Sequence, residues 1–212
     1  MKLTVFGATG GIGKEVVRQA LHAGHEVTAV VRDPARFTLS DGRGRLEVFR
    51  ADLTDPGALR PAVAGRDAVL SGLGARNRGD AGVAARLTRT VLAALEAEEV
   101  RRLMVVSAAP VGPEPEGEGL LDRAVRGVVS AVLKDIYADL REMEAAVARS
   151  AVDWTVVRPP RLQDKPLTGG YRAVVGGFPL RGRFIGRADV AHAMLGMVGD
   201  AATVKQGVGV AY

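Results

Sequence analysis

The chain of 212 residues is long enough to bury the core of one α/β domain, and 47% of its residues are hydrophobic. It has no cysteine, which excludes disulfides, thiolate nucleophiles and thiolate metal ligands, and its three histidines form no HxxxH-type pair of metal ligands. A formal charge of +5 does not by itself indicate a nucleic-acid partner, because the arginines are scattered and aromatic residues that stack on bases make up only 4% of the chain.

The N-terminal segment has the pattern of a strand–turn–helix–strand unit. An apolar strand is predicted at residues 3–6, and after a glycine turn the apolar positions of residues 14–23 recur at helical spacing. Gly24 ends this helix as a C-cap glycine does, and the β-branched run at 26–31 predicts a second, buried strand. The unit closes within about 30 residues, the length of a βαβ crossover.

The same alternation continues through the rest of the chain. Further strands are predicted at 46–50, 67–71, 103–107 and 153–160 (DWTVVRPP), and further helices at 56–63, 81–97 and 134–150. Alternation of this kind predicts an α/β fold, in which a doubly wound parallel sheet carries helices on both faces. Because we find no internal repeat and no second domain pattern, residues 1–212 are expected to form a single domain.

Residues 119–133 carry an additional apolar stripe at i, i+3, i+4 spacing. Three interpretations are open for this stripe: a helix packed on its own sheet, a lid over a bound cofactor, or a face for a second subunit. The spacing alone does not choose among them.

The turn after the first strand has the residues of a pyrophosphate-binding loop. Its glycines have GxxGxxG spacing and lie between a predicted strand and a predicted helix of a βαβ unit. In that position free backbone N–H groups and the positive end of the helix dipole face the carboxyl edge of the sheet. We therefore expect this loop to bind a dinucleotide through Gly7, Thr9, Gly10, Gly11, Ile12 and Gly13.

The end of the second strand indicates which dinucleotide is bound. NAD-binding sequences place an acid there to bind the ribose hydroxyls, whereas the 2′-phosphate of NADP requires cations. This chain has VVRDPAR, in which Arg32 ends the strand and Arg36 follows one helical turn later, and Thr9 adds a hydroxyl. The pattern favours NADP(H), and Asp33, one residue past the usual acid position, keeps NAD(H) as the alternative.

Residues after the third, fourth and fifth strands complete the expected cofactor site. Asp52 and Leu53 are expected to flank the adenine, with Asp52 accepting from its amino group. Ser107 ends the fifth strand beside the cofactor, where it either hydrogen-bonds the substrate or the carboxamide or simply finishes the strand. After the fourth strand the chain is expected to pass the middle of the cofactor at Leu73, Gly74 and Arg76.

Five stretches of the sequence resemble one family: GATGGIG, VVRDPAR, AGRDAVLSGLGARN, WTVVRPPRL and DKPLTGGYR. They are similar to the atypical short-chain dehydrogenase/reductases of the NAD(P)H-binding, NmrA-like type, and most of all to the biliverdin and flavin reductases among them. The resemblance covers nearly the whole chain except residues 110–135. It implies a single Rossmann domain that binds NADPH and reduces a flat acceptor such as a flavin, a quinone or a tetrapyrrole.

The resemblance also implies roles for single residues. The chain departs from the family pattern at two positions, with Ala108 in place of a serine and Arg161 in place of a histidine. Both family residues have been discussed as active-site groups, so these departures count against tetrapyrrole reduction. Where the pattern matches, the resemblance assigns the family's cofactor-phosphate contacts to Arg32, Arg36 and Arg76. It assigns the residues that line the nicotinamide, here called the nicotinamide wall, to Ser107, Pro159 and Pro160.

The sequence lacks the acid–base pair of the larger short-chain family. Those enzymes use Tyr-x-x-x-Lys, in which the lysine lowers the pKa of a tyrosine that passes a proton to a carbonyl. Here Tyr137 is followed four residues later by Arg141, a permanent cation of different shape. Tyr137 is therefore either a proton donor or, as we expect, an exposed helix residue without a catalytic role.

A flavin or quinone acceptor does not require such a pair. Hydride passes from the nicotinamide to an electron-poor ring, the proton can come from water, and positioning supplies most of the catalysis. Arg161 and Arg172, at the expected rim of the site, are then candidates to hold an anionic acceptor, the alternative being a solvated rim. A flavin is a substrate in this scheme and not a prosthetic group.

Two functions are compatible with these features of the sequence. The first is an NADPH-dependent oxidoreductase acting on a small-molecule electron acceptor, and the second is a non-catalytic NADP(H)-binding redox sensor. A sugar-nucleotide epimerase fits less well, because only about 50 residues follow the RPP strand. We expect a cytoplasmic monomer or homodimer without membrane or nucleic-acid partners, because there is no signal-peptide h-region and no apolar run near the roughly 20 residues that a membrane span needs.

Overall fold

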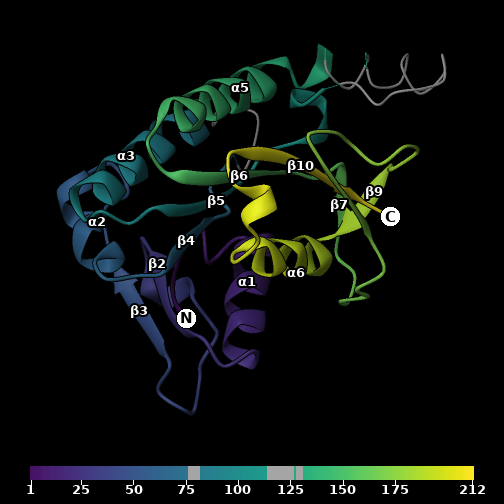
Figure 1. The fold of residues 1–212 in the computed structure, drawn as a ribbon. Coiled ribbons are helices and arrows are strands. Elements are labelled where there is room, and N and C mark those ends of the chain that lie inside the picture. Colours follow the sequence, from purple (N-terminus) through teal and green to yellow (C-terminus); the bar gives the residue numbers. More distant parts are fainter. Residues whose placement is uncertain (76–81, 114–126, 128–130) are drawn as a thin grey trace.

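Strands and helices alternate along the chain as predicted (Figure 1). The computed structural model describes residues 1–75, 82–113, 127 and 131–212. The strands are β1 (Lys2–Phe6), β2 (Glu26–Val31), β3 (Leu46–Arg50), β4 (Ala68–Ser71), β5 (Arg102–Val106), β6 (Asp153–Arg158), β7 (Arg161–Gln163), β8 (Arg172–Val175), β9 (Phe184–Gly186) and β10 (Gln206–Ala211). The main α-helices are α1 (Gly11–His22), α2 (Pro56–Val63), α3 (Val83–Ala97), α5 (Lys134–Arg149) and α6 (Arg187–Met197).

The strands form one large sheet in the order β3-β2-β1-β4-β5-β6-β10-β8. Neighbouring strands are parallel except for β8, which pairs antiparallel with β10. Because β1 pairs with both β2 and β4, the strand order changes direction at the β1–β4 pair, the place where doubly wound sheets bind their ligands. β7 and β9 form a separate parallel pair. The predicted fold class is confirmed.

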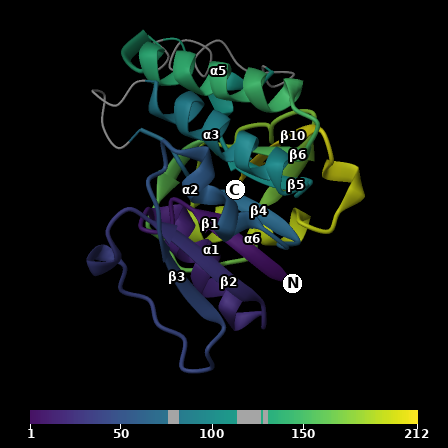
Figure 2. The same ribbon diagram turned by 90° about the vertical axis from the view of Figure 1, so that its left-hand side faces the viewer.

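Helices cover both faces of this sheet (Figure 1). α1 and α6 pack together on one face, over a core that includes Leu3 and Met194. α2, α3 and α5 cover the other face, over a core that includes Phe6, Leu95 and Met143. Figure 2 shows α3 and α5 lying side by side. Within the described ranges, no helix is long and apolar enough to cross a membrane.

The contact between α3 and α5 includes a cap for the first turn of α3. The N-cap position of α3 is Gly82, which has no side chain to accept a hydrogen bond. The carboxylate of Asp139, on α5, accepts instead from the backbone N–H groups of Ala84 and Ala85, each at 2.9 Å. Asp139 is only 4% exposed. A buried charge on one helix therefore satisfies the free donors at the start of the other.

Several element boundaries differ from the sequence predictions. α1 begins at Gly11 rather than residue 14, so it includes two of the loop's glycines, and α3 begins at Val83. α6 and β10 are not among the predicted elements. The stripe at 119–133 lies almost entirely outside the described residues, so its three interpretations stay open.

Candidate functional site

The turn from β1 into α1 is closed by contacts that require residues without a side chain. Gly7 has a φ of 72°, and a Cβ at this position would stand 2.8 Å from the carbonyl group of Gly72, which follows β4. A Cβ on Gly13 would stand 2.2 Å from the Gly7 carbonyl oxygen. The N–H of Gly10 donates to that same oxygen at 2.8 Å. β1, the end of β4 and the first turn of α1 therefore meet at backbone distance.

The first turn of α1 offers backbone N–H groups that no side chain caps. The N-cap residue is Gly10, and no acidic residue lies in the first turn. The first backbone hydrogen bond of the helix runs from the Lys14 N–H to the Gly10 carbonyl at 2.8 Å. The N–H groups of Gly11, Ile12 and Gly13 precede that bond and have no partner within the helix. Together with the helix dipole they make this end of α1 a place for an anion.

A hollow of about 260 Å³ lies beside this turn, lined by Thr9, Arg32, Asp33 and Arg36. Among the residues that the structure describes, neither guanidinium has a hydrogen-bond or ion-pair partner. The Asp33 carboxylate accepts from the Ala35 N–H at 3.1 Å and caps the short turn Pro34–Arg36. The acid therefore has a local structural role, and the two cations are the groups left to bind an anion in the hollow.

The residues predicted after β3 and β4 are placed in three different ways. Asp52 is exposed, and hydrogen bonds from the Thr54 N–H at 2.9 Å and the Thr54 hydroxyl at 2.8 Å hold its pKa below the ordinary value. Leu53 is buried in the core, so adenine contacts for Asp52 and Leu53 stay predictions. After β4, Leu73 is buried, and a Cβ on Gly74 would have no atom within 4 Å. Arg76 lies outside the described residues.

The carboxyl ends of β5 and β6 are held together at the position predicted for the nicotinamide. The Ser107 N–H donates to the Val157 carbonyl at 2.8 Å, and the Ala109 N–H donates to the Pro159 carbonyl at 2.9 Å. Ser107 is 6% exposed, and its hydroxyl has no hydrogen-bond partner among the described residues. The Ser107 hydroxyl is therefore free to pair with a molecule bound at this edge, and its contact with the substrate or the carboxamide stays a prediction. Pro160 continues this wall and is half-buried.

Tyr137 is not the exposed residue that we expected. It is 7% exposed and packs in the core between α5, α3 and the sheet. Burial raises the pKa of its hydroxyl, the opposite of the change that a Tyr-x-x-x-Lys pair produces. The proton-donor role of Tyr137 stays a prediction, and this environment does not favour it.

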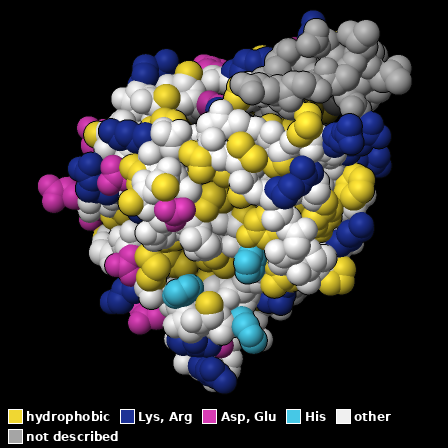
Figure 3. All heavy atoms as spheres, turned by 45° about the vertical axis from the view of Figure 1, so that its right-hand side comes forward, with side chains coloured by type: hydrophobic (Ala, Val, Ile, Leu, Met, Phe, Trp, Pro, Cys, Tyr) yellow, Lys and Arg dark blue, Asp and Glu magenta, His cyan; other side chains and the backbone are white. Residues whose placement is uncertain are grey.

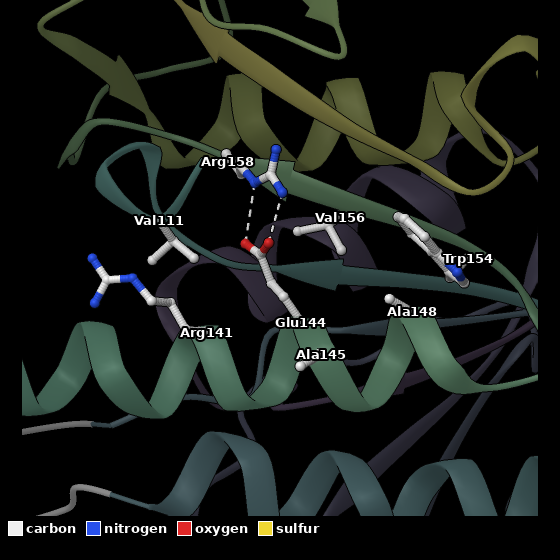
Figure 4. Close-up of a pocket in the computed structure, with 8 residues that line it drawn as sticks. All are labelled: Val111, Arg141, Glu144, Ala145, Ala148, Trp154, Val156 and Arg158. Carbon is white, nitrogen blue, oxygen red and sulfur yellow. Dashed lines mark hydrogen bonds and ion pairs between the residues drawn. The ribbon is translucent and has the colours of Figure 1, made fainter. Parts of the chain in front are cut away.

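A second hollow, of about 300 Å³, lies between α5 and β6 (Figure 4). Glu144 on α5 accepts from the Arg158 guanidinium at 2.6 and 3.1 Å, and both side chains are largely buried. Arg141 points along the same groove away from this pair. Because Arg158 directly precedes Pro159, the ion pair fixes the strand end that forms the predicted nicotinamide wall. The sequence analysis did not identify Glu144, whose only signal is its position on the α5 face.

Arg161 and Arg172 lie on strands of different sheets. Arg161 is exposed on β7, whereas Arg172 lies on β8 and donates to the carbonyl groups of Leu180 and Tyr212. A contact between Arg172 and an acceptor, still a prediction, would require the guanidinium to leave these carbonyls. In Figure 3, Lys and Arg side chains gather along the right-hand margin, on the side of β7 and β9.

The segment 164–170, which contains the DKPLTGG stretch, is attached to the first turn of α6 by Asp189. This carboxylate is fully buried and accepts from the Gly169 N–H at 2.8 Å, the Thr168 N–H at 3.1 Å and the Tyr212 hydroxyl at 2.6 Å. Burial alone would raise the pKa of Asp189, but these hydrogen bonds outweigh it and hold the pKa below its ordinary value. The network therefore fixes both the segment and the start of α6 against the sheet.

The head of α1 is also covered by the side chain of Arg187, a residue to which the sequence analysis gave no role. The Cδ and Nε of Arg187, the first residue of α6, stand 2.5 and 2.8 Å from where a Cβ on Gly11 would lie. Its Nη1 donates to Asp164 at 2.7 Å.

No cluster of three or more acidic or histidine side chains in the described ranges could hold a metal ion.

The chain matches a known protein family over most of its length. The family model described as NAD(P)H-binding matches residues 7–201. A (4-alkanoyl-5-oxo-2,5-dihydrofuran-3-yl)methyl phosphate reductase of Streptomyces griseus is 32% identical over 186 residues, a match that covers 84% of this chain and 57% of that protein. The chain thus spans little more than half the length of this curated relative.

Two solved structures share the fold over the whole chain. A short-chain dehydrogenase/reductase of the wide type from Veillonella parvula, solved in complex with NADP, has a TM-score of 0.83 at 20% identity and is covered over 94% of its length. A candidate NADH-flavin reductase from Streptococcus pneumoniae has a TM-score of 0.80 at 23% identity and is covered over 99% of its length. In both cases 100% of this chain is covered.

Proposed function

The chain belongs to the NAD(P)H-binding family. We propose that it is an NADPH-dependent reductase that transfers hydride to a flat acceptor such as a flavin or a quinone. One observation carries the cofactor part of this proposal. The uncapped first turn of α1 lies beside a hollow in which Arg32 and Arg36 have no partner among the described residues. These are the two anion sites that a dinucleotide with an additional 2′-phosphate needs.

Three groups of residues support this cofactor assignment. The N–H groups of Gly11, Ile12 and Gly13 would hold the diphosphate, and the two arginines of the hollow would hold the 2′-phosphate. The unpaired Ser107 hydroxyl would donate to or accept from the nicotinamide carboxamide. When bound, NADPH would supply the hydride, and the protein's part would be to hold the nicotinamide ring against the acceptor.

The proposed choice of acceptor rests on the environment of Tyr137, the candidate proton donor. Tyr137 is buried with a raised pKa, and no cysteine exists in the chain. A carbonyl acceptor requires a proton from the protein as hydride arrives, whereas a flavin or quinone can take its proton from water. The exposed Arg161 on β7 would attract the anionic form of such an acceptor.

The lack of an exposed acid–base pair at Tyr137 and Arg141 also supports a second function, an NADP(H)-binding sensor without turnover.

A turnover assay distinguishes the two functions. If the protein is a reductase, the purified protein should oxidise NADPH when FMN, FAD or quinones are added, as measured by the loss of NADPH absorbance. Arg161→Ala should raise KM for an anionic flavin more than KM for a neutral quinone. Tight binding of NADPH without turnover of any acceptor would favour the sensor.

Arg32→Ala tests the choice between the two dinucleotides. A charge-assisted hydrogen bond contributes about 1.5–3 kcal/mol, so the Kd for NADPH should rise roughly 10- to 100-fold. The Kd for NADH should change less than about 3-fold, since NADH has no 2′-phosphate for the guanidinium to bind. Isothermal titration calorimetry with both cofactors measures this difference. The control for loss of one positive charge is Arg60→Ala, at an exposed arginine on α2. An equal rise in the Kd values for NADPH and NADH in Arg32→Ala would refute the phosphate assignment.

A further inference from the structure

Arg187 occupies the space that a side chain at Gly11 would fill. Gly11 is the first residue of α1, and the stem of Arg187 passes over it, with Cδ and Nε 2.5 and 2.8 Å from where a Cβ on Gly11 would lie. A side chain at Gly11 would therefore displace the arginine from this position. The only hydrogen bond of the guanidinium within the described ranges runs from Nη1 to Asp164 at 2.7 Å. The Arg187 side chain is 30% exposed. Its charged end therefore lies at the mouth of the glycine turn and not in the core.

This placement is unfavourable for a cation unless an anion joins it. The uncapped first turn of α1 carries positive partial charge, and Arg187 is itself at the first position of α6, another positive helix end. The one acid that pairs with it, Asp164, is 89% exposed, and exposed ion pairs contribute little. Positive potential from the head of α1 and from the Arg187 guanidinium thus meets at one point, while the start of α6 is partly balanced by the buried Asp189 carboxylate in its first turn.

We propose that Arg187 binds the diphosphate of the dinucleotide. The absence of a side chain at Gly11 leaves room for the Arg187 guanidinium to reach that diphosphate. This inference rests on the proposed function, in which the same helix end holds the diphosphate. The planar guanidinium bonds phosphate oxygens in a fork that complements the N–H groups of the first turn.

The assignment predicts a pattern that differs from that of Arg32 and Arg36. Because NADPH and NADH have the same diphosphate, loss of Arg187 weakens both cofactors by a similar factor, whereas loss of a 2′-phosphate ligand weakens NADPH alone. A purely structural role for Arg187, as a brace between α6 and segment 161–165, would lower the thermal midpoint of the free protein and leave the cofactor Kd unchanged.

Calorimetric titration of the full chain with NADPH and with NADH tests this. Arg187→Ala and Arg187→Gln should each raise both Kd values about 10-fold or more, the effect of one charge-assisted hydrogen bond, and Arg187→Lys should recover part of the loss. Asp164→Ala and the distant Arg60→Ala should stay within about 3-fold of the wild type. The thermal midpoints of the cofactor-free variants show whether each variant is folded. If Arg187→Ala is unstable, the Kd values of Arg187→Gln, which keeps most of the aliphatic stem, are the ones that test the proposal.

The outcomes separate this inference from the function on which it rests. If the wild-type protein binds both cofactors and Arg187→Gln binds them equally well, the inference fails and the proposed function stands. Selective loss of NADPH affinity would also overturn it, since Arg187 would then act on the 2′-phosphate. If the wild-type protein binds neither cofactor, the proposed function fails and takes the inference with it.

Discussion

Gly13→Ala is expected to lower the free energy of unfolding by about 2–3 kcal/mol and to bring NADPH binding below detection. Helix propensity alone predicts the opposite, a gain of about 0.5–1 kcal/mol, because alanine is the better residue inside a helix. The new Cβ, however, would stand 2.2 Å from the Gly7 carbonyl oxygen and 2.7 Å from its carbon. Both are backbone atoms, so the overlap can be relieved only by moving α1 away from β1.

The neighbouring structure limits that movement. Gly7 has a left-handed backbone conformation, and a Cβ there would stand 2.8 Å from the backbone of Gly72. The turn therefore has no room to move toward the end of β4. Denaturant unfolding measures the stability and calorimetry the cofactor affinity. The control is Gly196→Ala on α6, where a Cβ meets nothing within 4 Å and should stabilise by up to about 1 kcal/mol. Wild-type stability of Gly13→Ala would show that helix and strand are not in this close contact.

The parts of the fold that follow from local sequence were predictable. The predicted strands at 26–31 and 46–50 and the helix at 56–63 coincide with β2, β3 and α2, because alternation, caps and apolar spacing act within one element. The glycine turn could be predicted for the same reason. Its spacing, strand and helix are all contained in one short segment.

The C-terminal elements depend on contacts between distant residues and so were missed. β10 reads QGVGVA, a poor strand by propensity. Its glycines are explained by what lies against them: a Cβ on Gly207 would stand 2.2 Å from the Arg158 guanidinium, and one on Gly209 would stand 2.5 Å from the Gly177 carbonyl. α6 is buried over most of its surface and lacks a polar face, so its apolar pattern has no helical period.

The candidate site divides in the same way. The free N–H groups and the pair Arg32 and Arg36 belong to segments whose roles are set by position along the chain. The burial of Tyr137, the unpaired hydroxyl of Ser107 and the passage of Arg187 over Gly11 arise only when separate segments pack together. Composition and spacing carry no signal for such contacts.

Asp139→Ala is expected to lower the free energy of unfolding by about 3 kcal/mol, because hydrogen bonds to a charged group contribute about 1.5–3 kcal/mol and two are lost. The Ala84 and Ala85 N–H groups would remain buried without acceptors, and Gly82 cannot replace the cap. Asp139→Asn, which keeps one neutral acceptor, should lose about half as much, and the exposed Asp135→Ala on the same helix should change stability by less than about 1 kcal/mol. Because the cap joins two helices, amide hydrogen exchange in Asp139→Ala should accelerate first in the initial turn of α3, before the strands open. Exchange that accelerates equally across the sheet would mean that Asp139 stabilises the fold globally and does not act as a cap for α3.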